Sequence, residues 1–381
     1  MSADVLADGV RAAVGAVIDP ELRRPLGDLD MIADVTVTDG RARVEVRLTI
    51  VGCPAADRIE REVRVAAAGV SGITAVEVAL GVMTPDQRAA LTERLRGGRA
   101  RSIPFTAESL TRVIAVTSGK GGVGKSTLTA NLAAALAQHG RSVGLIDADV
   151  HGFSIPGLLG LVDADGRTVR PTRIDDLIVP PIAYGVKTVS IGMFLREGEE
   201  RSAVAWRGPM LHRTVQQFLT DVWFGDVDVL LIDMPPGTGD VAISVGQLLP
   251  HAEVLVVTTP QAAAADVAVR SGLVARQTGQ RVIGVVENMA PFRLPDGTVV
   301  DLFGSGGGAD VARALSTDAE NVPLLASVPL STALRTGGDT GTPVVVADPD
   351  DPAARAIDAL AVTLADTPRG LAGRTLPFAV R

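Results

Sequence analysis

Cysteine is almost absent from this chain of 381 residues. Its single cysteine, Cys53, cannot form a disulfide within the chain, so a site built on several thiolates would need ligands from elsewhere. Although 46% of the residues are hydrophobic, no uninterrupted apolar run reaches the roughly 18 residues of a membrane-spanning helix. The N-terminus carries Asp4 and Asp8 and no basic lead-in, unlike a secretory signal peptide. We therefore expect a cytoplasmic protein with no membrane partner.

The net charge of −8 argues against broad nucleic-acid binding, so we do not expect a nucleic-acid partner.

Lysine is scarce as well. Of the 36 basic residues only Lys120, Lys125 and Lys187 are lysines, and the first two lie in one glycine-rich loop. An ammonium is a compact point charge, whereas a guanidinium is broad and planar. The placement of these two lysines therefore indicates a tight phosphate pocket.

The first 96 residues predict a small α+β domain. Two alternating stretches joined through Asp39-Gly40 predict a β-hairpin, and Thr84-Pro85 predicts the start of a helix. The expected helices are 3–17, 55–68 and 86–95, and the expected strands are 31–38, 41–50 and 73–80. Residues 97–109 read as a linker, and the arginines in and just before it as a solvated connector.

From residue 110 to residue 366 the pattern changes. Short apolar runs alternate with helical segments, which predicts an α/β domain with a mostly parallel, doubly wound sheet covered on both faces. The runs are 113–116, 143–146, 229–232, 254–257 and 282–286. The last residues, 367–381, contain several glycines and prolines and are expected to form a loose tail.

The central motif is a phosphate-binding loop of a P-loop NTPase, Gly119–Ser126, between an expected strand and an expected helix. Lys125 should reach the β- and γ-phosphates, the Ser126 hydroxyl should bind Mg²⁺, and Thr127 should lie by the α-phosphate. The other residues expected to bind the nucleotide through the backbone are Gly119, Gly121, Gly122, Val123 and Gly124. The motif predicts ATP and Mg²⁺ as cofactors and ATP hydrolysis as the activity.

Three aspartates follow predicted strands. Because the carboxyl ends of parallel strands meet at the ligand-binding edge of a sheet, we expect active-site roles rather than strand-end capping. Asp233 is expected to hold Mg²⁺, Asp147 to contribute to the metal shell, and Asp149 to position or activate the attacking water.

The second lysine of the loop, Lys120, resembles the signature of the deviant Walker A class of MinD, ParA and the nitrogenase iron protein. The resemblance implies a homodimer in which this lysine reaches the nucleotide of the other subunit, where it stabilises charge in the transition state. Asn288 resembles the residue of that class that reads adenine. An ordinary turn asparagine is the alternative.

The order of motifs resembles the Mrp/ApbC family of iron–sulfur cluster carrier ATPases. The matching segments are Gly119–Ser126, Asp147–Gly152, Trp206–Met210, Asp233–Asp240, Glu287–Met289 and Phe303–Gly308, with Asp19–Glu21 and Thr49–Pro54 in the first domain. The resemblance implies binding of iron–sulfur clusters and transfer to apoproteins, with apo iron–sulfur proteins or assembly factors as partners. The family's Cys-x-x-Cys pair is replaced here, at Leu294 and Gly297.

Two questions stay open at this point. Cys53 is either a packing residue, or a ligand or partner contact that works with outside thiols. The chain as a whole is an iron–sulfur carrier, a nucleotide-gated adaptor without a cluster, or a dimeric positioning switch of the ParA or MinD kind.

Overall fold

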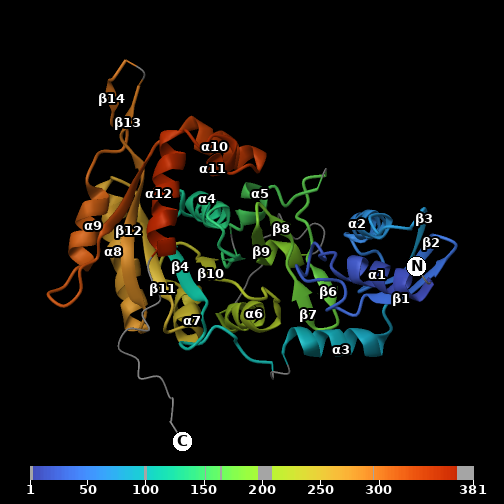
Figure 1. Ribbon diagram of the computed structural model, residues 1–381. Helices are drawn as coiled ribbons and strands as arrows, with labels where there is room; N and C mark the ends of the chain where they lie inside the picture. The colour runs from blue at the N-terminus through green and yellow to red at the C-terminus, as the bar shows by residue number, and fades with distance from the viewer. Residues whose placement is uncertain are drawn as a thin grey trace, which may run out of the picture. The chain divides into compact units, whose positions relative to one another are not determined.

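The computed structural model describes residues 3–97, 101–150, 152–163, 165–195, 208–294 and 296–366 (Figure 1). The family motif residues Trp206 and Arg207, and the predicted tail 367–381, lie outside the described residues. The chain forms two compact units. The first unit comprises Met1–Ser102, Pro171–Pro181 and Thr220–Gly225, and the second comprises Ile103–Arg170, Ile182–Leu219 and Asp226–Arg381.

The first unit is a small α+β fold with a three-stranded sheet. Its elements are α1 (Ala3–Gly15), β1 (Ile32–Thr38), β2 (Arg41–Leu48), α2 (Ala56–Ala68), β3 (Ala75–Val82), α3 (Pro85–Leu95), β6 (Thr172–Ile174) and β7 (Leu177–Val179). Strand β2 pairs antiparallel with β1 and parallel with β3. Asp39 and Gly40 between β1 and β2 both have positive φ, as the tight Asp-Gly turn requires, so the predicted hairpin is confirmed.

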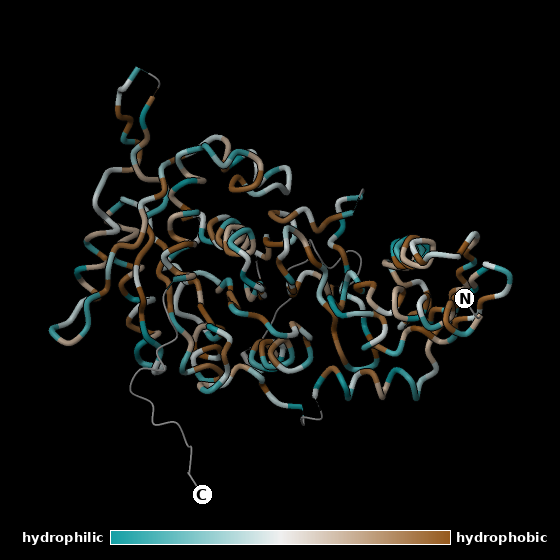
Figure 2. The backbone as a smooth tube through the Cα atoms, in the orientation of Figure 1, coloured by the Kyte–Doolittle hydropathy of each residue, from teal (hydrophilic) through white to brown (hydrophobic). Residues whose placement is uncertain are grey.

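Helix α3 begins as its sequence predicts. The Gln87 amide N–H donates to Thr84 Oγ1, while Gln87 Oε1 accepts from the Thr84 amide at 2.9 Å, which makes a complete capping box with Pro85 as the first helical residue. Figure 2 shows hydrophilic and hydrophobic residues following one another along α3. Its buried residues Leu91 and Leu95 join the core of the unit.

Two segments from far along the chain complete this unit. Strands β6 and β7 form a short antiparallel hairpin, and the Trp223 amide donates to Ile178 O at 2.8 Å. Four of their buried side chains belong to the same hydrophobic core as α1, α2 and the sheet, namely Ile174, Leu177, Val179 and Trp223. The sequence did not predict that these two segments belong to the first unit.

Arginines near the predicted linker hold these two segments in the first unit. Arg88 pairs with Asp175 at 3.3 Å and Arg96 with Asp176 at 3.0 Å. Arg101 pairs through both Nε and Nη2 with Asp221, which is buried. The interpretation of these arginines as a solvated connector is therefore incomplete, because Arg96 and Arg101 pair with acids of the inserted segments while the side chain of Arg101 stays 50% exposed.

We expect Leu177→Ala to destabilise the first unit by about 2–4 kcal/mol, because it removes a buried side chain that the core cannot fully close over. Trp223 fluorescence during urea unfolding of a Trp206→Phe background reports on this unit. Val65→Ala is the matched control, since Val65 lies on α2 and is 72% exposed. Equal unfolding midpoints for the two variants would contradict the place of the inserted hairpin in this core.

The second unit contains an eight-stranded sheet. Its elements are β4 (Arg112–Ser118), α4 (Lys125–Gln138), β5 (Val143–Asp147), α5 (Ile155–Leu158), β8 (Ile182–Ala183), β9 (Val186–Ser190), the 3₁₀ helix η1 (Ile191–Phe194), α6 (Gly208–Asp221, which ends in the first unit), β10 (Val229–Asp233), α7 (Asp240–Leu248), β11 (Glu253–Thr258), α8 (Ala262–Gln277), β12 (Arg281–Ala290), β13 (Phe292–Arg293), β14 (Val299–Val300), α9 (Gly307–Leu315), β15 (Leu324–Pro329), α10 (Thr332–Thr340), α11 (Val344–Ala347) and α12 (Pro352–Asp366).

The strand order is β15-β12-β11-β4-β10-β5-β9-β8, and only the edge strand β8 is antiparallel to its neighbour. The predicted mostly parallel, doubly wound sheet is confirmed. Strands β9 and β15 were missed. Strand β9 carries polar residues in a buried run, and β15 is a half-exposed edge strand that ends in proline.

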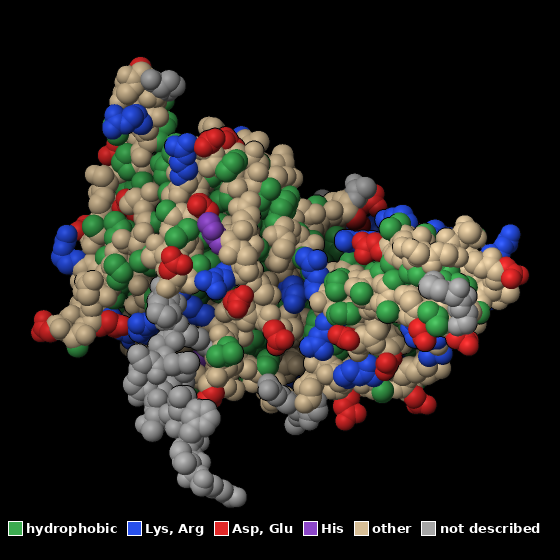
Figure 3. All heavy atoms as spheres, in the orientation of Figure 1, with side chains coloured by type: hydrophobic (Ala, Val, Ile, Leu, Met, Phe, Trp, Pro, Cys, Tyr) green, Lys and Arg blue, Asp and Glu red, His purple; other side chains and the backbone are tan. Residues whose placement is uncertain are grey.

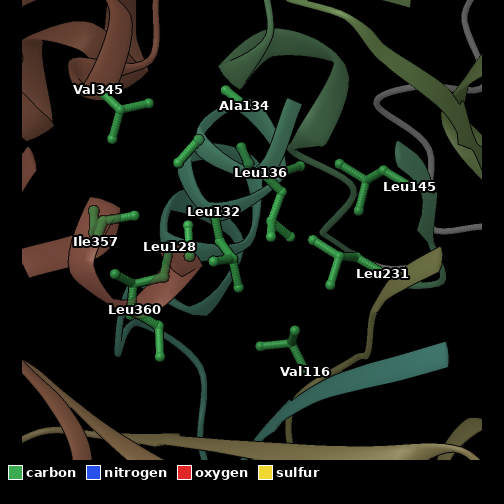
Figure 4. Close-up of a cluster of buried hydrophobic side chains, with 14 of the residues drawn as sticks. Val116, Leu128, Leu132, Ala134, Leu136, Leu145, Leu231, Val345, Ile357 and Leu360 are labelled. Carbon is green, nitrogen blue, oxygen red and sulfur yellow. The ribbon is translucent and has the colours of Figure 1, made fainter. Parts of the chain in front are cut away.

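Helices cover both faces of this sheet. One core cluster joins α4, α12 and alternate strand residues. In Figure 4, Leu128 and Leu132 lie between the α12 residues Ile357 and Leu360 on one side and the strand residues Leu231 and Val116 on the other. Helices α8 and α9 pack on β4, β11 and β12 but contribute nothing to that cluster, so they cover the opposite face. Both faces of the sheet are therefore shielded from water, as the continuous apolar strands require.

Three strand ends meet at one edge of the sheet. Strand β10 lies between β4 and β5, and Asp233 is in register with Val116 on one side and Asp147 on the other. This arrangement brings the loop after β4 beside both carboxylates.

On the face shown in Figure 3, acidic and basic side chains are interspersed over both units. No helix in the described part of the chain is long and apolar enough to cross a membrane.

Candidate nucleotide site

Glycines set the shape of the loop between β4 and α4, and two of them show how. Gly124 caps α4 with a φ of +80°, a conformation that side-chain-bearing residues rarely adopt. Gly119 has an ordinary φ, but there is no space for a side chain at this position, since a Cβ there would lie 2.2 Å from the carbonyl carbon of Val267 on α8. The first glycine of the motif therefore packs the loop against α8, and Gly124 turns the chain into α4.

Asp233 gathers three side chains of α4. Lys125 Nζ lies 2.7 Å from Asp233 Oδ2, and Ser126 Oγ donates to the same oxygen at 2.6 Å. Thr129 Oγ1 donates to Asp233 Oδ1 at 2.9 Å. Lys125 and Asp233 are both buried, so each neutralises a charge that would otherwise be costly to bury. Thr129 was missed, and its only sequence signal is its position one helical turn after Lys125.

An open cavity of about 240 Å³ lies over the loop. Of the predicted residues, those lining it are Lys120, Gly121, Gly122, Val123, Gly124, Lys125, Ser126, Thr127 and Asp149. The cavity is also lined by Ser118, Gly152, Ser154 and Pro236. Gly152 and Pro236 lie in segments that carry the family resemblance, although neither was predicted as a site residue. Gly119, Asp147, Asp233 and Asn288 are not among the lining residues.

The two aspartates after β5 have different surroundings. Asp149 lines the cavity, and its Oδ1 accepts from the Gly152 amide at 3.0 Å. Asp147 is fully buried and accepts from the amides of Asp149 and Ile155 and from Ser190 Oγ at 3.0 Å. Burial first, and then the nearby charge of Asp233, raise the pKa of Asp147. This geometry favours Asp147 as the residue that fixes the loop carrying Asp149, and its place in a metal shell stays a prediction.

Asn288 lies beneath the loop. Its Nδ2 donates to Val123 O at 2.8 Å, and it fills the space where a Cβ of Gly124 would be. The adjacent Glu287 is buried and accepts from the Gly308 amide at 2.7 Å, at the start of α9. The segment Glu287–Met289 thus joins the phosphate loop to α9. The adenine-reading role of Asn288 stays a prediction.

The residues present fit a magnesium ion. Ser126 Oγ and the Asp233 carboxylate are hard oxygen donors within 2.6 Å of each other, and Mg²⁺ is usually held by one or two such groups plus substrate phosphates and water. The described residues contain no cluster of three or more His, Cys, Asp or Glu side chains suited to a metal. A nucleotide-linked ion therefore fits this site better than an all-protein metal cage.

Two family models match the chain. The model described as NUBPL iron-transfer P-loop NTPase matches residues 109–365. This chain belongs to that family. The model described as iron-sulfur cluster assembly protein matches residues 7–80, within the first unit. Both match the family resemblance that the motifs carry.

Relatives and solved structures agree. An iron-sulfur cluster carrier protein of Mycobacterium bovis is 53% identical over 371 residues, which cover 96% of this chain and 95% of the relative. A protein of the same name from Synechocystis is 40% identical over 360 residues, covering 94% and 96%. The septum site-determining protein MinD of Pyrococcus horikoshii, solved with Mg-ADP, is 26% identical with a TM-score of 0.50, covering 67% of this chain and 96% of that one. The chain is therefore a nucleotide-binding P-loop NTPase.

The positions of the missing cysteine pair lie on the hairpin β13–β14, which projects from the second unit (Figure 1). Leu294 is 39% exposed, and its amide donates to Thr298 O. Gly297 has a φ of +87°, and a Cβ added there would meet no atom within 4 Å. Neither residue supplies a thiolate, the usual ligand of iron–sulfur clusters. The hairpin does not fit a cluster.

Cys53 lies inside the first unit. Its side chain is 6% exposed, and Sγ donates to Glu21 Oε2 at 3.6 Å. Thr172 Oγ1, from the inserted β6, donates to the other oxygen of Glu21 at 2.6 Å. Burial, with smaller contributions from the charges of Glu21 and Asp19, raises the pKa of the Cys53 thiol to about 11. The packing alternative for Cys53 is the one that this geometry favours.

We expect iodoacetamide to alkylate Cys53 much more slowly than a peptide thiol at pH 8. The thiolate is the reactive form, and with a pKa of about 11 its fraction rises nearly ten-fold per pH unit up to that value. Mass spectrometry of native and urea-unfolded chain between pH 7 and 9 measures the two rates. A native rate equal to the unfolded rate at pH 8 would contradict the enclosed position of the thiol.

Proposed function

We propose that the chain is an ATP-hydrolysing homodimer that carries iron–sulfur clusters to apoproteins. One observation supports this most directly. A single chain joins a phosphate loop, whose Lys125 and Ser126 meet Asp233, to a region that matches the iron-sulfur cluster assembly family. Relatives along almost the whole length are named as carriers. The positioning-switch alternative has no comparable support.

In the proposed hydrolysis, backbone amides of the loop and Lys125 hold the phosphates, and Asp149 orients the attacking water from the cavity wall. Lys120 of one subunit stabilises the charge that develops at the partner's nucleotide. A bound Mg²⁺, held by Ser126 and Asp233, would neutralise phosphate charge. Asp147 keeps the loop that carries Asp149 in place.

The cluster is cargo in this proposal, and its thiolate ligands come mainly from outside the chain. The chain has one cysteine, which is buried, and the hairpin β13–β14 has none. A donor or acceptor protein, or a small thiol, must therefore keep its own thiolates on the cluster while this chain is bound. Apo iron–sulfur proteins and assembly factors are the partners that fit.

Anaerobic reconstitution with iron and sulfide, with and without a small dithiol, tests the ligand part of the proposal. We expect the wild type and Cys53→Ser to behave alike, and to retain cluster only with the dithiol present. We expect the variant Leu294→Cys/Gly297→Cys to retain cluster without it. If the wild type held a stoichiometric cluster without dithiol and Cys53→Ser lost it, that result would contradict external ligation.

A nucleotide-gated adaptor is the second candidate, and the enclosed Cys53 and the thiol-free hairpin favour it. It predicts that the wild type retains no iron or sulfide even with dithiol, while Mg-ATP still changes its binding to an apo iron–sulfur protein. Iron content and a nucleotide-dependent pull-down on the same preparation separate the two candidates.

A further inference from the structure

Lys120 has a definite partner within its own chain. Its Nζ donates to the side-chain oxygen of Gln261 at 3.2 Å, across 141 positions of sequence. Gln261 directly precedes α8, and its exposed side chain makes no capping hydrogen bond to that helix. Its amide oxygen is therefore available to Lys120 rather than needed by α8.

The backbone of Lys120 is held in place by contacts of its own and the preceding residues, while its side chain is half-buried. Ser118 Oγ donates to Lys120 O at 3.1 Å, and Gly119 packs directly against Val267 and Ala268 of α8. The side chain is thus the part of Lys120 that is free to change partner. Gln261 lies on the same side of the loop because α8 itself is the surface on which Gly119 packs.

The contact with Gln261 is a weak one by its chemistry. The amide oxygen is neutral, and the N-terminal end of α8, with no acidic residue in its first turn, disfavours a nearby cation. The hydrogen bond offsets that repulsion without forming an ion pair. A lysine held in this way is kept in a defined place but is released at little cost.

We propose that Gln261 is a positioning residue that holds Lys120 on its own subunit and so sets how readily the two chains associate on ATP. The inference rests on the proposed function, in which Lys120 acts on the partner's nucleotide. Lys120 must then leave Gln261 when a dimer forms. The apparent affinity of the two chains for each other is therefore proportional to the fraction of chains in which Lys120 is released. A carboxylate at position 261 would hold the ammonium more tightly, and a methyl group would not hold it.

The test is steady-state ATP hydrolysis as a function of protein concentration. We expect Gln261→Ala to lower the concentration of half-maximal turnover roughly two- to five-fold, and Gln261→Glu to raise it by a similar factor. Gln277→Ala and Gln277→Glu, at the exposed last residue of α8, are matched controls with no expected change. Nucleotide affinity of the separate chains should stay unchanged, because Gln261 is not among the residues lining the cavity.

In a Lys120→Ala background the two Gln261 variants should form ATP-dependent dimers identically in sedimentation experiments. Opposite shifts that vanish in that background support the proposal. The proposal would be overturned if both variants shifted the concentration of half-maximal turnover in the same direction, or if the shifts persisted in the Lys120→Ala background. It would also be overturned if neither variant shifted that concentration although Lys120→Ala itself hydrolyses ATP slowly. Normal turnover of Lys120→Ala would instead defeat the role of Lys120 in the proposed function.

Discussion

Lys125→Ala should abolish ATP hydrolysis, with turnover reduced at least about 10³-fold, because the variant loses the cation that meets the β- and γ-phosphates. It should also weaken the nucleotide-free protein. Asp233 is 1% exposed, and without Lys125 its buried carboxylate loses its neighbouring positive charge. Breaking such a pair costs about 3–5 kcal/mol. Phosphate release and thermal unfolding of the same preparation measure the two effects.

The double variant Lys125→Ala/Asp233→Asn separates these effects. It removes the uncompensated charge and keeps one amide oxygen, which can accept from either Ser126 or Thr129, so we expect it to regain part of the lost stability and none of the turnover. Recovery of both would mean that Lys125 serves the fold and not the phosphates. Recovery of neither would contradict the neutralising role of the Lys125–Asp233 pair.

Lys120→Ala should reduce turnover about 10²-fold while leaving nucleotide affinity within a few-fold, because the side chain acts across the dimer and not on its own nucleotide. Lys120 lines the cavity, and its side chain makes a single hydrogen bond to the neutral side chain of Gln261, so little stability should be lost. Fluorescent-nucleotide titration and phosphate release distinguish binding from chemistry.

Mixing two inactive variants tests the direction of this effect. In a heterodimer of Lys120→Ala with Lys125→Ala, the first chain keeps Lys125 for its own nucleotide and receives Lys120 from the second. We therefore expect the mixture to regain a substantial part of wild-type turnover, whereas each variant alone stays slow. A mixture that is no faster than its components would show that Lys120 acts within its own chain.

The sequence predicted the parts of this molecule that depend on local patterns. The phosphate loop, the hairpin at Asp39-Gly40 and the capping box at Thr84 each need only neighbouring residues, and the structure has the loop, hairpin and cap where they were expected. The central strands were predicted because each is a continuous apolar run, and that pattern indicates burial on both faces.

Long-range partnerships were beyond the sequence. Strands β6 and β7 have three residues each, too few to show a period, and their core lies about a hundred positions earlier in the chain. The partners of Arg101 and Lys120 are 120 and 141 positions away. The adenine role of Asn288 rests on a resemblance and stays a prediction, whereas the hydrogen bond from its amide to Val123 O joins residues 165 positions apart. Such pairings follow from the packing of whole elements and not from spacing.

Cluster transfer is the most direct test of the proposed carrier function. The measurement is the rate at which a cluster moves from a thiol-held donor complex into an apo-ferredoxin, followed by visible absorbance, with wild type, Lys125→Ala or no added chain. We predict that wild type with Mg-ATP accelerates transfer and that Lys125→Ala does not. Equal rates in all three reactions would contradict a nucleotide-driven role in cluster delivery.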